Sequence, residues 1–185
     1  METRPYLLHA LSPLHAGIGQ SVAAIDLPIA RMKGTNLPFL PGSSIKGVLR
    51  EERQPKEPVP EQTDRHNAVF GPARDSVGED GDNANLYQGA LSVSDARLLL
   101  LPVRSFRRVF AYVTSPLLLR LAQRDVPALK NLKLPTFSKS DPAAQVPPGE
   151  SWVVHSDGKV YLEDQDLPAS ATKEAGDFAL ALATA

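Results

Sequence analysis

The chain has 185 residues, a length that suits one domain or one domain with a sizeable insertion. Hydrophobic residues make up 42% of it, which is enough for a core, and the absence of cysteine excludes disulfides and thiolate metal sites. The N-terminus has no apolar core of the signal-peptide type, and no apolar run approaches membrane-spanning length. We therefore expect a cytoplasmic protein with no membrane partner.

The net charge of −1 is unevenly distributed along the chain. Residues 1–50 carry +3 and residues 90–135 carry +6, whereas residues 51–89 and 136–185 each carry −5. The two basic blocks also contain the best apolar patterns, which favours a body that binds a polyanion and has solvated acidic loops. Solvated faces without a ligand explain the charge pattern, taken alone, about equally well.

The stretch Ser12–Arg50 concentrates the chemistry of the chain. Residues 6–11 have strand character, and a long loop containing glycines follows them. The residues at 41–44 (PGSS) predict a turn whose serines cap a helix. Lys46 and Arg50 are four residues apart and share a face of that helix. Free backbone N–H groups at a helix start beside a lysine favour phosphate binding.

After this helix, residues 51–88 read as a long polar loop, because charged residues and proline dominate and apolar residues are few. An apolar island at 68–72 interrupts the loop and ends in a turn. We expect the island to anchor the loop on the body of the protein.

Order resumes at Ala90. The following segments have strand-like or helical patterns: strands at 91–94, 98–101 and 109–113, a basic connection at 104–108, and a helix opened by Ser115 and Pro116. Leu117, Leu118, Leu121 and Ala122 are the expected buried stripe of the helix, and Pro127 is expected to end it. The arginines at 104–108 can meet phosphates, although a solvated hairpin tip is the commoner use of such residues.

The last third contains the clearest hairpin, residues 152–162 around an Asp157-Gly158 turn, and a final segment, 177–185, that alternates like a strand. The order strand, helix, strand, strand, helix is most of a ferredoxin-like split βαβ unit. We therefore predict an α+β fold. Aromatic residues are only 6% and no stacking signature is apparent, so RNA contact is expected to be mainly electrostatic.

Several blocks together resemble a known family. In chain order they are SPLHAGIGQ, IDLPIAR, LPGSSIKGVLRE, VFGP, ALSVSDARLLLLPVRS and FAYVTSPLLLRL, spanning roughly residues 4–125. They look like the backbone subunit of Cmr-type (type III-B) CRISPR effector complexes, which belongs to the RAMP superfamily. The resemblance implies a modified ferredoxin-like (RRM-like) palm with long loop insertions and a protruding thumb.

The resemblance also implies a function in antiviral defence. In that family, copies of the subunit stack into a helical filament along a guide CRISPR RNA, together with other Cmr-type subunits. The thumb displaces nucleotides at regular intervals, and the target single-stranded RNA is cut at each displaced position with a divalent metal required. Asp26 occupies the place of the essential aspartate. His15 lies on the same loop, and Ser43, Ser44, Lys46 and Arg50 match the guide-RNA contact. Arg31, at the end of the IDLPIAR block, is added to the RNA-binding set.

The residue types suit RNA cleavage, because RNA carries its own nucleophile in the 2′-hydroxyl. Asp26 can act as a base or as a ligand of Mg²⁺, with phosphates and water completing the shell. Blander readings remain open. Asp26 can cap a turn, His15 can fix the loop through a backbone hydrogen bond, and the serines can simply cap a helix. The alternative function is a non-catalytic RNA-binding scaffold of a CRISPR filament.

The domain prediction has three parts. Residues 1–185 form a single palm that looks incomplete at its C-terminal end, because chains of this family continue well beyond this length. Residues 51–89 are expected to be a flexible acidic and proline-rich insertion, and residues 131–165 are the candidate thumb or hairpin region. His9, His66 and His155 are expected to be structural or without ligand partners, and Asp95 is expected to pair with an arginine such as Arg97.

Overall fold

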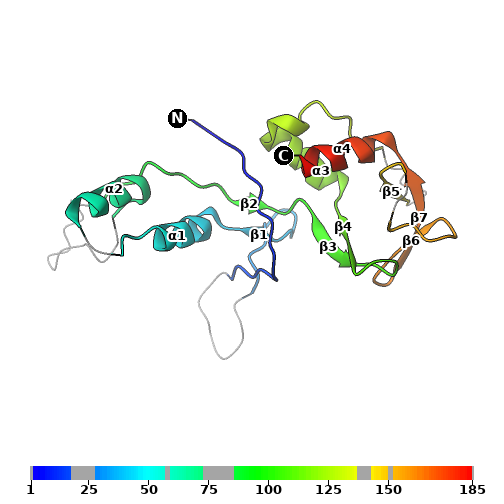
Figure 1. Cartoon of the computed structure of the whole chain (residues 1–185), viewed down its shortest axis with the longest axis horizontal. Helices are drawn as coiled ribbons and strands as arrows, with labels where there is room; N and C mark the ends of the chain where they lie inside the picture. Colours follow the sequence, from blue (N-terminus) through cyan, green and yellow to red (C-terminus); the bar gives the residue numbers. More distant parts are fainter. Residues whose placement is uncertain are drawn as a thin grey trace. The chain divides into compact units, whose positions relative to one another are not determined.

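The computed structural model describes residues 2–17, 28–56, 59–72, 86–136, 143–149 and 152–184. Helices and strands are both present, which confirms the α+β class (Figure 1). The chain divides into two compact units: Ala10–Arg97, and Leu98–Ala185 together with Met1–His9. Among the described residues, no helix is both long and apolar enough to cross a membrane.

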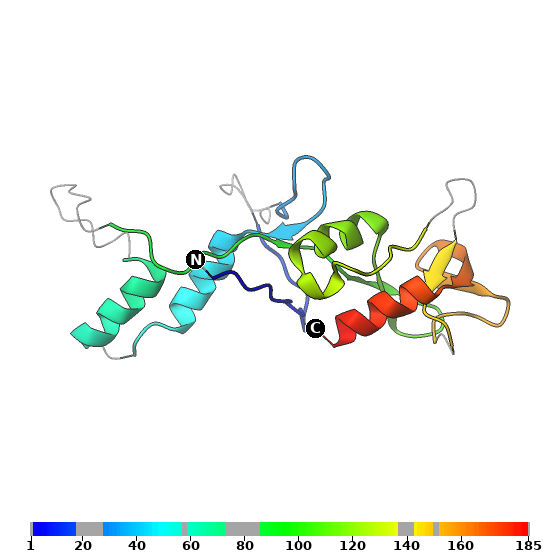
Figure 2. The same ribbon diagram turned by 90° about the horizontal axis from the view of Figure 1, so that it is seen from above.

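The unit Ala10–Arg97 contains a short antiparallel pair and two helices. β1 (Phe39–Leu40) pairs with β2 (Ala96–Arg97), α1 spans Gly42–Glu52, and α2 spans Pro60–Phe70. α1 and α2 lie side by side (Figures 1 and 2), and the Nε2 atom of His66 on α2 lies 2.9 Å from the carbonyl oxygen of Arg50 on α1. The helix predicted to follow the turn at residues 41–44 is confirmed as α1.

The prediction of a continuous loop over 51–88 is wrong at residues 60–70, which form α2. Pro60 begins this helix at a position where a missing N–H costs nothing, and polar residues then cover its exposed surface. The predicted anchoring of residues 68–72 is confirmed. The N–H groups of Ala90 and Leu91 donate to the carbonyl oxygens of Ala68 and Val69, each at 2.9 Å.

The other unit is built on strands, and three helical segments accompany them. The elements are β3 (Leu101–Arg104), β4 (Phe110–Val113), α3 (Pro116–Asp125), the 3-10 helix η3 (Pro127–Leu129), β5 (Ala144–Val146), β6 (Lys159–Leu162), β7 (Gln165–Ala171) and α4 (Lys173–Ala183). β3 and β4 form an antiparallel hairpin. β7 lies between β5, to which it is parallel, and β6, to which it is antiparallel.

The core of this unit lies between α3, η3 and α4. Leu119, Leu129 and Phe178 are 3%, 0% and 3% exposed and pack together. The Ser115 hydroxyl accepts a hydrogen bond from Leu118 N–H, which confirms the predicted cap, and Pro127 follows the end of the helix as predicted. The predicted buried stripe is rotated, because Leu119 is buried while Leu117 is 47% exposed.

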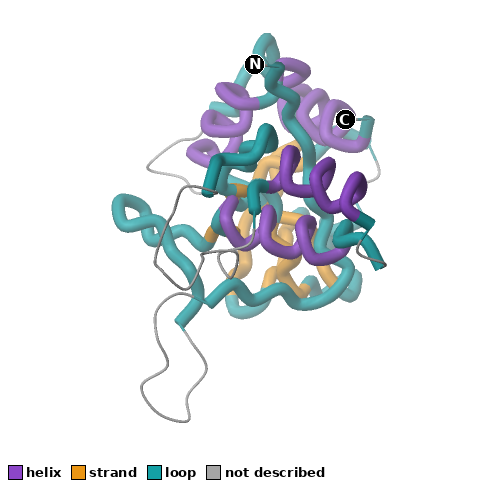
Figure 3. The backbone as a smooth tube through the Cα atoms, turned by 90° about the vertical axis from the view of Figure 1, so that its left-hand side faces the viewer, coloured by secondary structure: helices purple, strands orange, loops and turns teal. Residues whose placement is uncertain are grey.

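Two strand predictions at the ends of the chain are wrong. Residues 6–11 form no strand, and residues 177–183 belong to α4. The alternation near the C-terminus is misleading, because alanine and leucine are strong helix formers and Thr172 caps the helix by accepting a hydrogen bond from Ala175 N–H. Figure 3 colours the described chain by secondary structure and shows the N-terminal segment as loop.

The central strands are shorter than predicted, or displaced. Residues 91–94 form no strand, and the strand expected at 98–101 begins at Leu101, whereas the one at 109–113 is present as β4. The Asp157-Gly158 turn is confirmed, with Gly158 at φ +79° and the Asp157 carboxylate accepting from Lys159 N–H. The described strands form sheets of two, two and three strands, so a ferredoxin-like sheet and a thumb at 131–165 remain predictions.

Candidate RNA-binding site

The residues on either side of the Asp26 segment are bonded to each other. Gly17 and Ile29 form an antiparallel bridge, and the N–H of Ala30 donates to the carbonyl oxygen of Ala16 at 2.7 Å. Asp26 itself lies outside the described residues. Ala30 is fully buried, and its carbonyl oxygen accepts from Phe39 N–H at 3.1 Å, two residues before Pro41, the N-cap residue of α1. The fold therefore fixes the chain on both sides of the Asp26 segment and links it to the start of α1.

His15 and Arg31 flank this base. His15 is exposed and lies two residues before Gly17, which forms the bridge to Ile29. Arg31 is also exposed, and its Nη1 donates to the carbonyl oxygen of Asn36 at 2.9 Å, which holds the guanidinium over the turn between Arg31 and Pro38. Arg31 therefore has part of its donor set engaged within the chain and part facing solvent.

Three of the four predicted RNA-contacting residues on α1 lie on one face of the helix. Ser43, Lys46 and Arg50 are three and four residues apart and so lie on one face, while Ser44 lies on the adjoining one. Both serines are exposed, and the two basic side chains are partly exposed. Among the ion pairs between described residues, none involves Lys46 or Arg50. Both cations are therefore available to an external anion.

The start of α1 differs from the prediction. The N-cap residue is Pro41, and neither serine caps the helix. Instead, the Asp95 carboxylate accepts a hydrogen bond from Gly42 N–H at 2.8 Å, and Ser44 N–H donates to the carbonyl oxygen of Pro41 at 3.0 Å. A carboxylate next to the positive end of the helix dipole takes the place that a phosphate would occupy. The helix can therefore meet RNA through its side face rather than through its N-terminal end.

The remaining histidines and Asp95 have structural roles. His66 contacts the Arg50 carbonyl and the ring of Phe70, and the Nε2 of His9 lies 2.9 Å from the Tyr112 hydroxyl. His155 Nδ1 lies 3.2 Å from the Asp157 carboxylate. The role of Asp95, a hydrogen bond to a helix start 53 positions away, was not predictable from local spacing.

The described residues do not by themselves form a metal site, since no group of three or more His, Asp or Glu side chains that could hold an ion occurs among them. The sequence analysis also missed the exposed aromatic side chains of the β3–β4 hairpin, Phe106 at its tip and Phe110 and Tyr112 on β4. The available signal was the spacing of Phe110 and Tyr112, which places both rings on one face of a strand.

The chain belongs to the RAMP superfamily, whose family model matches residues 7–173. It is 36% identical over 159 residues to the CRISPR system Cmr endoribonuclease Cmr4 of Pyrococcus furiosus, and the match covers 85% of this chain and 49% of that protein. The family resemblance inferred from the sequence blocks is thus confirmed. The chain spans about half the length of the curated relative that it matches.

Two solved structures show the same fold. The crystal structure of oligomeric Cmr4 from Pyrococcus furiosus has 34% sequence identity and a TM-score of 0.58, with 86% of this chain and 52% of that chain covered. The cryo-EM structure of the type III-B Cmr-beta complex bound to cognate target RNA contains a chain with 20% identity and a TM-score of 0.53, covering 88% and 57%. At 20% identity this second likeness concerns the fold alone.

Proposed function

We propose that this chain is a guide-RNA-binding backbone element of a type III-B CRISPR effector complex that cuts bound target RNA in the cytoplasm. The observation that carries the proposal is the 36% identity to a Cmr endoribonuclease over most of the chain. The family match at 7–173 includes both the Asp26 segment and α1. The proposed partners are a guide CRISPR RNA, a target single-stranded RNA, further copies of the chain in a helical filament and other Cmr-type subunits.

The proposed guide-RNA contact is the face of α1 with Ser43, Lys46 and Arg50, with Ser44 and Arg31 beside it. The two cations bind phosphates of the guide backbone, and the hydroxyls donate to phosphate oxygens. The support for this contact is the partial exposure of the face, and the fact that no described carboxylate pairs with Lys46 or Arg50. Such contacts position an RNA without reading its sequence.

The proposed cleavage uses Asp26 as the base. Its carboxylate accepts the proton of the target 2′-hydroxyl, the 2′-oxygen bonds to the adjacent phosphorus, and the bond from phosphorus to the 5′-oxygen breaks. His15 is the proposed donor of the proton to the leaving 5′-oxygen. The products are a 2′,3′-cyclic phosphate and a 5′-hydroxyl. A divalent metal, Mg²⁺, is proposed to be required, and Asp26 is the residue that would hold it, with phosphates and water completing the shell.

The test is cleavage of guide-matched RNA by the reconstituted complex, comparing wild type with Asp26→Asn and with and without Mg²⁺. We expect Asp26→Asn to abolish cleavage while the affinity for RNA stays within about twofold, because an isosteric amide keeps the shape of the loop but cannot accept a proton. End-group analysis should show 2′,3′-cyclic phosphates. Equal cutting by the variant would instead favour the non-catalytic scaffold, with the cut made by another subunit.

A second pair of variants tests the RNA contact. Lys46→Ala and Arg50→Ala together should weaken guide-RNA binding and reduce the salt dependence of binding by roughly two phosphate contacts. Arg120→Ala, which removes an exposed arginine of α3 in the other unit, is the matched control. An unchanged salt slope in the α1 double variant would contradict the proposed guide-RNA contact.

A further inference from the structure

The tip of the β3–β4 hairpin continues beyond its own sheet and joins β6. Ser105 forms an antiparallel bridge with Leu162, and Phe106 N–H donates to the carbonyl oxygen of Tyr161 at 3.1 Å. On the other side of the bridge, Glu163 N–H donates to the carbonyl oxygen of Arg104 at 3.0 Å. One bridge and two backbone hydrogen bonds therefore join the end of β3 to the end of β6, while β3–β4 and β5–β7–β6 remain separate sheets.

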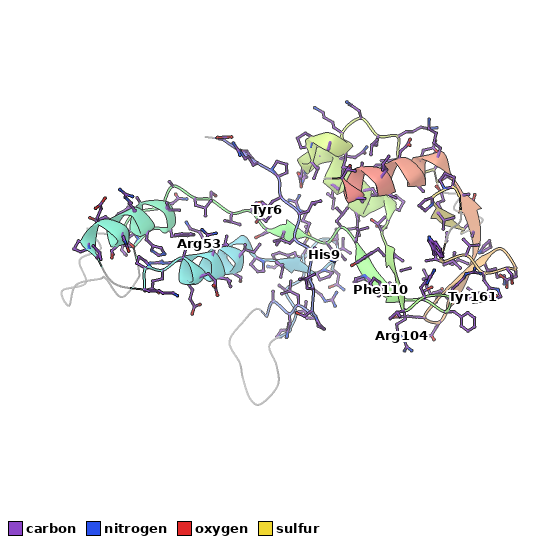
Figure 4. All side chains as sticks on the ribbon, in the orientation of Figure 1. Tyr6, His9, Arg53, Arg104, Phe110 and Tyr161 are labelled. Atoms are coloured by element: carbon purple, nitrogen blue, oxygen red, sulfur yellow. The ribbon has the colours of Figure 1, made fainter. Side chains whose placement is uncertain are left out.

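Alternation along these strands places aromatic side chains on one face. Val160 of β6 is 2% exposed and faces the interior, so Tyr161 faces the opposite side. The ring of Phe106 contacts that of Tyr161, with centroids 6.1 Å apart. Arg104 lies directly opposite Phe110 in the hairpin register, and Tyr112 follows on the same face of β4. We call the rings of Tyr112, Phe110, Phe106 and Tyr161 the aromatic row. Figure 4 labels Arg104, Phe110 and Tyr161 on the three strands.

The rings of the aromatic row are both accessible and held in place. Phe106 is 79% exposed, Phe110 47% and Tyr112 49%. The Phe110 and Tyr112 rings meet edge to face, with centroids 5.3 Å apart, and the Tyr112 hydroxyl lies within hydrogen-bonding distance of His9. The Tyr161 hydroxyl donates to the Asp157 carboxylate at 2.6 Å. Rings that are already ordered lose little conformational freedom on binding a ligand.

The charge around the aromatic row favours a polyanion. From Leu98 to Ser115 the sequence contains three arginines, Arg104, Arg107 and Arg108, and no aspartate or glutamate. Arg104, Arg107 and Arg108 make no ion pair with any described residue, and the Arg108 guanidinium lies 4.5 Å from the centroid of the Trp152 ring.

Two of the neighbouring carboxylates are engaged within the chain. Asp157 accepts from Tyr161, and Asp166 lies 2.8 Å from the Lys159 ammonium. Glu163 and Asp164, in the turn after β6, are further negative charges among the described residues near β6. These two carboxylates lie after β6, whereas the only charged residues of the β3–β4 hairpin, residues 101–113, are arginines.

We infer that the aromatic row is a second RNA-binding surface, which stacks about two or three unpaired bases of a single-stranded RNA while Arg104 and the hairpin-tip arginines bind its phosphates. The inference rests on the proposed function, because it assumes that the chain binds RNA. It adds a base-stacking contact to an RNA interface that the sequence predicted to be mainly electrostatic. The exposed rings offer stacking surfaces for bases, and the guanidinium groups beside them, which make no ion pair with any described residue, offer phosphate ligands; these are the two kinds of contact that a single-stranded nucleic acid requires.

The test uses the 185-residue chain and a fluorescent uridine oligonucleotide of about 12 nucleotides. Phe106→Leu, Phe110→Leu and Tyr112→Leu keep an apolar side chain but remove the ring. Each is expected to weaken binding of the single strand about tenfold and to leave binding of a duplex of the same length unchanged. Leu117→Ala is the matched control, since Leu117 on α3 is as exposed as Phe110 (47%) but lies outside the aromatic row.

A second measurement does not depend on the folding of a variant. Photo-crosslinking of the wild-type chain to an RNA containing 4-thiouridine should label the tryptic peptide Val109–Arg120, which contains Phe110 and Tyr112. Crosslinks confined to the Lys46 and Arg50 region would overturn the inference and leave the proposed function intact. The inference is also overturned, and the proposed function left intact, if a triple variant that combines Phe106→Leu, Phe110→Leu and Tyr112→Leu binds RNA like wild type.

Two further outcomes separate the alternatives. If the triple variant changes self-association and not RNA binding, the aromatic row contacts a second copy of the chain, and the inference is wrong. If the wild-type chain binds neither single-stranded nor duplex RNA, the proposed function fails, and the inference fails with it.

Discussion

The two compact units differ in what stabilises each of them internally. In the unit Leu98–Ala185, apolar side chains from three helical segments fill a common core. In the unit Ala10–Arg97, the described residues that are buried are Ala30 and three glycines, Gly42, Gly71 and Gly89. Here backbone segments approach one another directly. A Cβ on Gly89 would lie 2.3 Å from the backbone nitrogen of Gly71, and a Cβ on Gly42 would lie 2.1 Å from the Val93 carbonyl oxygen.

The difference indicates where each unit tolerates change. A core of large side chains is damaged when volume is removed, whereas glycine contacts are damaged when a single methyl group is added. Among the described residues of the glycine-based unit, the longer side chains are partly or fully exposed, including those of α1.

The largest expected effect is in the side-chain core. Phe178→Ala should lower the free energy of unfolding by about 3–5 kcal/mol, because the ring is 3% exposed and its loss leaves a cavity beside Leu119 and Leu129. Chemical denaturation followed by circular dichroism measures this loss. Leu180→Ala, on the same helix but 67% exposed, is the control. Equal losses for the two variants would remove the contrast between the units.

The complementary change adds one methyl group. Gly42→Ala should destabilise the Ala10–Arg97 unit by about 1–3 kcal/mol, since its Cβ meets backbone that cannot move aside. Gly47→Ala is the matched control in the same helix, with nothing among the described residues within 4 Å of its Cβ. It should stabilise α1 by about 1 kcal/mol. Amide hydrogen exchange in α1 measures both, and protection that rises in both variants would refute the close-approach argument.

A smaller effect is expected at the hydrogen bond that closes the start of α1. Asp95→Ala leaves Gly42 N–H without its acceptor, which should cost about 1–2 kcal/mol and increase amide exchange in the first turn of α1. Asp95→Asn keeps an oxygen acceptor and should lose less than half of that stability. If the asparagine variant is as unstable as the alanine variant, the interaction with the helix dipole dominates over the hydrogen bond.

The smallest effect is a pH dependence in the strand unit. The hydrogen bond from the Tyr161 hydroxyl, with smaller contributions from Lys159 N–H and His155, lowers the pKa of the Asp157 carboxyl below its usual value of 3.8. A depressed pKa means that the stabilisation is present above the unfolded pKa and is lost as the pH falls through the folded one.

Tyr161→Phe should raise the pKa of Asp157 back toward its usual value. An NMR titration of the carboxyl carbon measures the shift, and the variant should still bind single-stranded RNA because the ring remains. An unchanged titration would show that Tyr161 does not set the pKa of Asp157.

Local signals in the sequence predicted local structure well. Ser115-Pro116 predicted the start of α3, and Asp157-Gly158 predicted the turn before β6, because each depends on residues within one turn of chain. The same reasoning failed at α4, where an alternating pattern of alanine and leucine is also compatible with a helix. It failed at α2 as well, whose polar surface resembles that of a loop.

Non-local contacts limited what could be predicted about the candidate site. The residues of the α1 face follow from helical spacing alone. The acceptor at the start of α1 comes from Asp95, which no rule of local spacing connects to Gly42. The aromatic row combines side chains from β4, β6 and the hairpin tip, and its assembly depends on the bridge between Ser105 and Leu162.

The hydrogen bond between Asp95 and Gly42 has a consequence for the order in which the chain acquires structure during synthesis. The two residues are 53 positions apart, and the β1–β2 pairing likewise joins Leu40 to Ala96. During synthesis, Leu40 and Gly42 leave the ribosome well before Asp95 and Ala96. These contacts therefore cannot form until the segment around residue 97 has left the exit tunnel. Until then α1 lacks its acceptor, so we expect the helix to fray in nascent chains that stop short of this point.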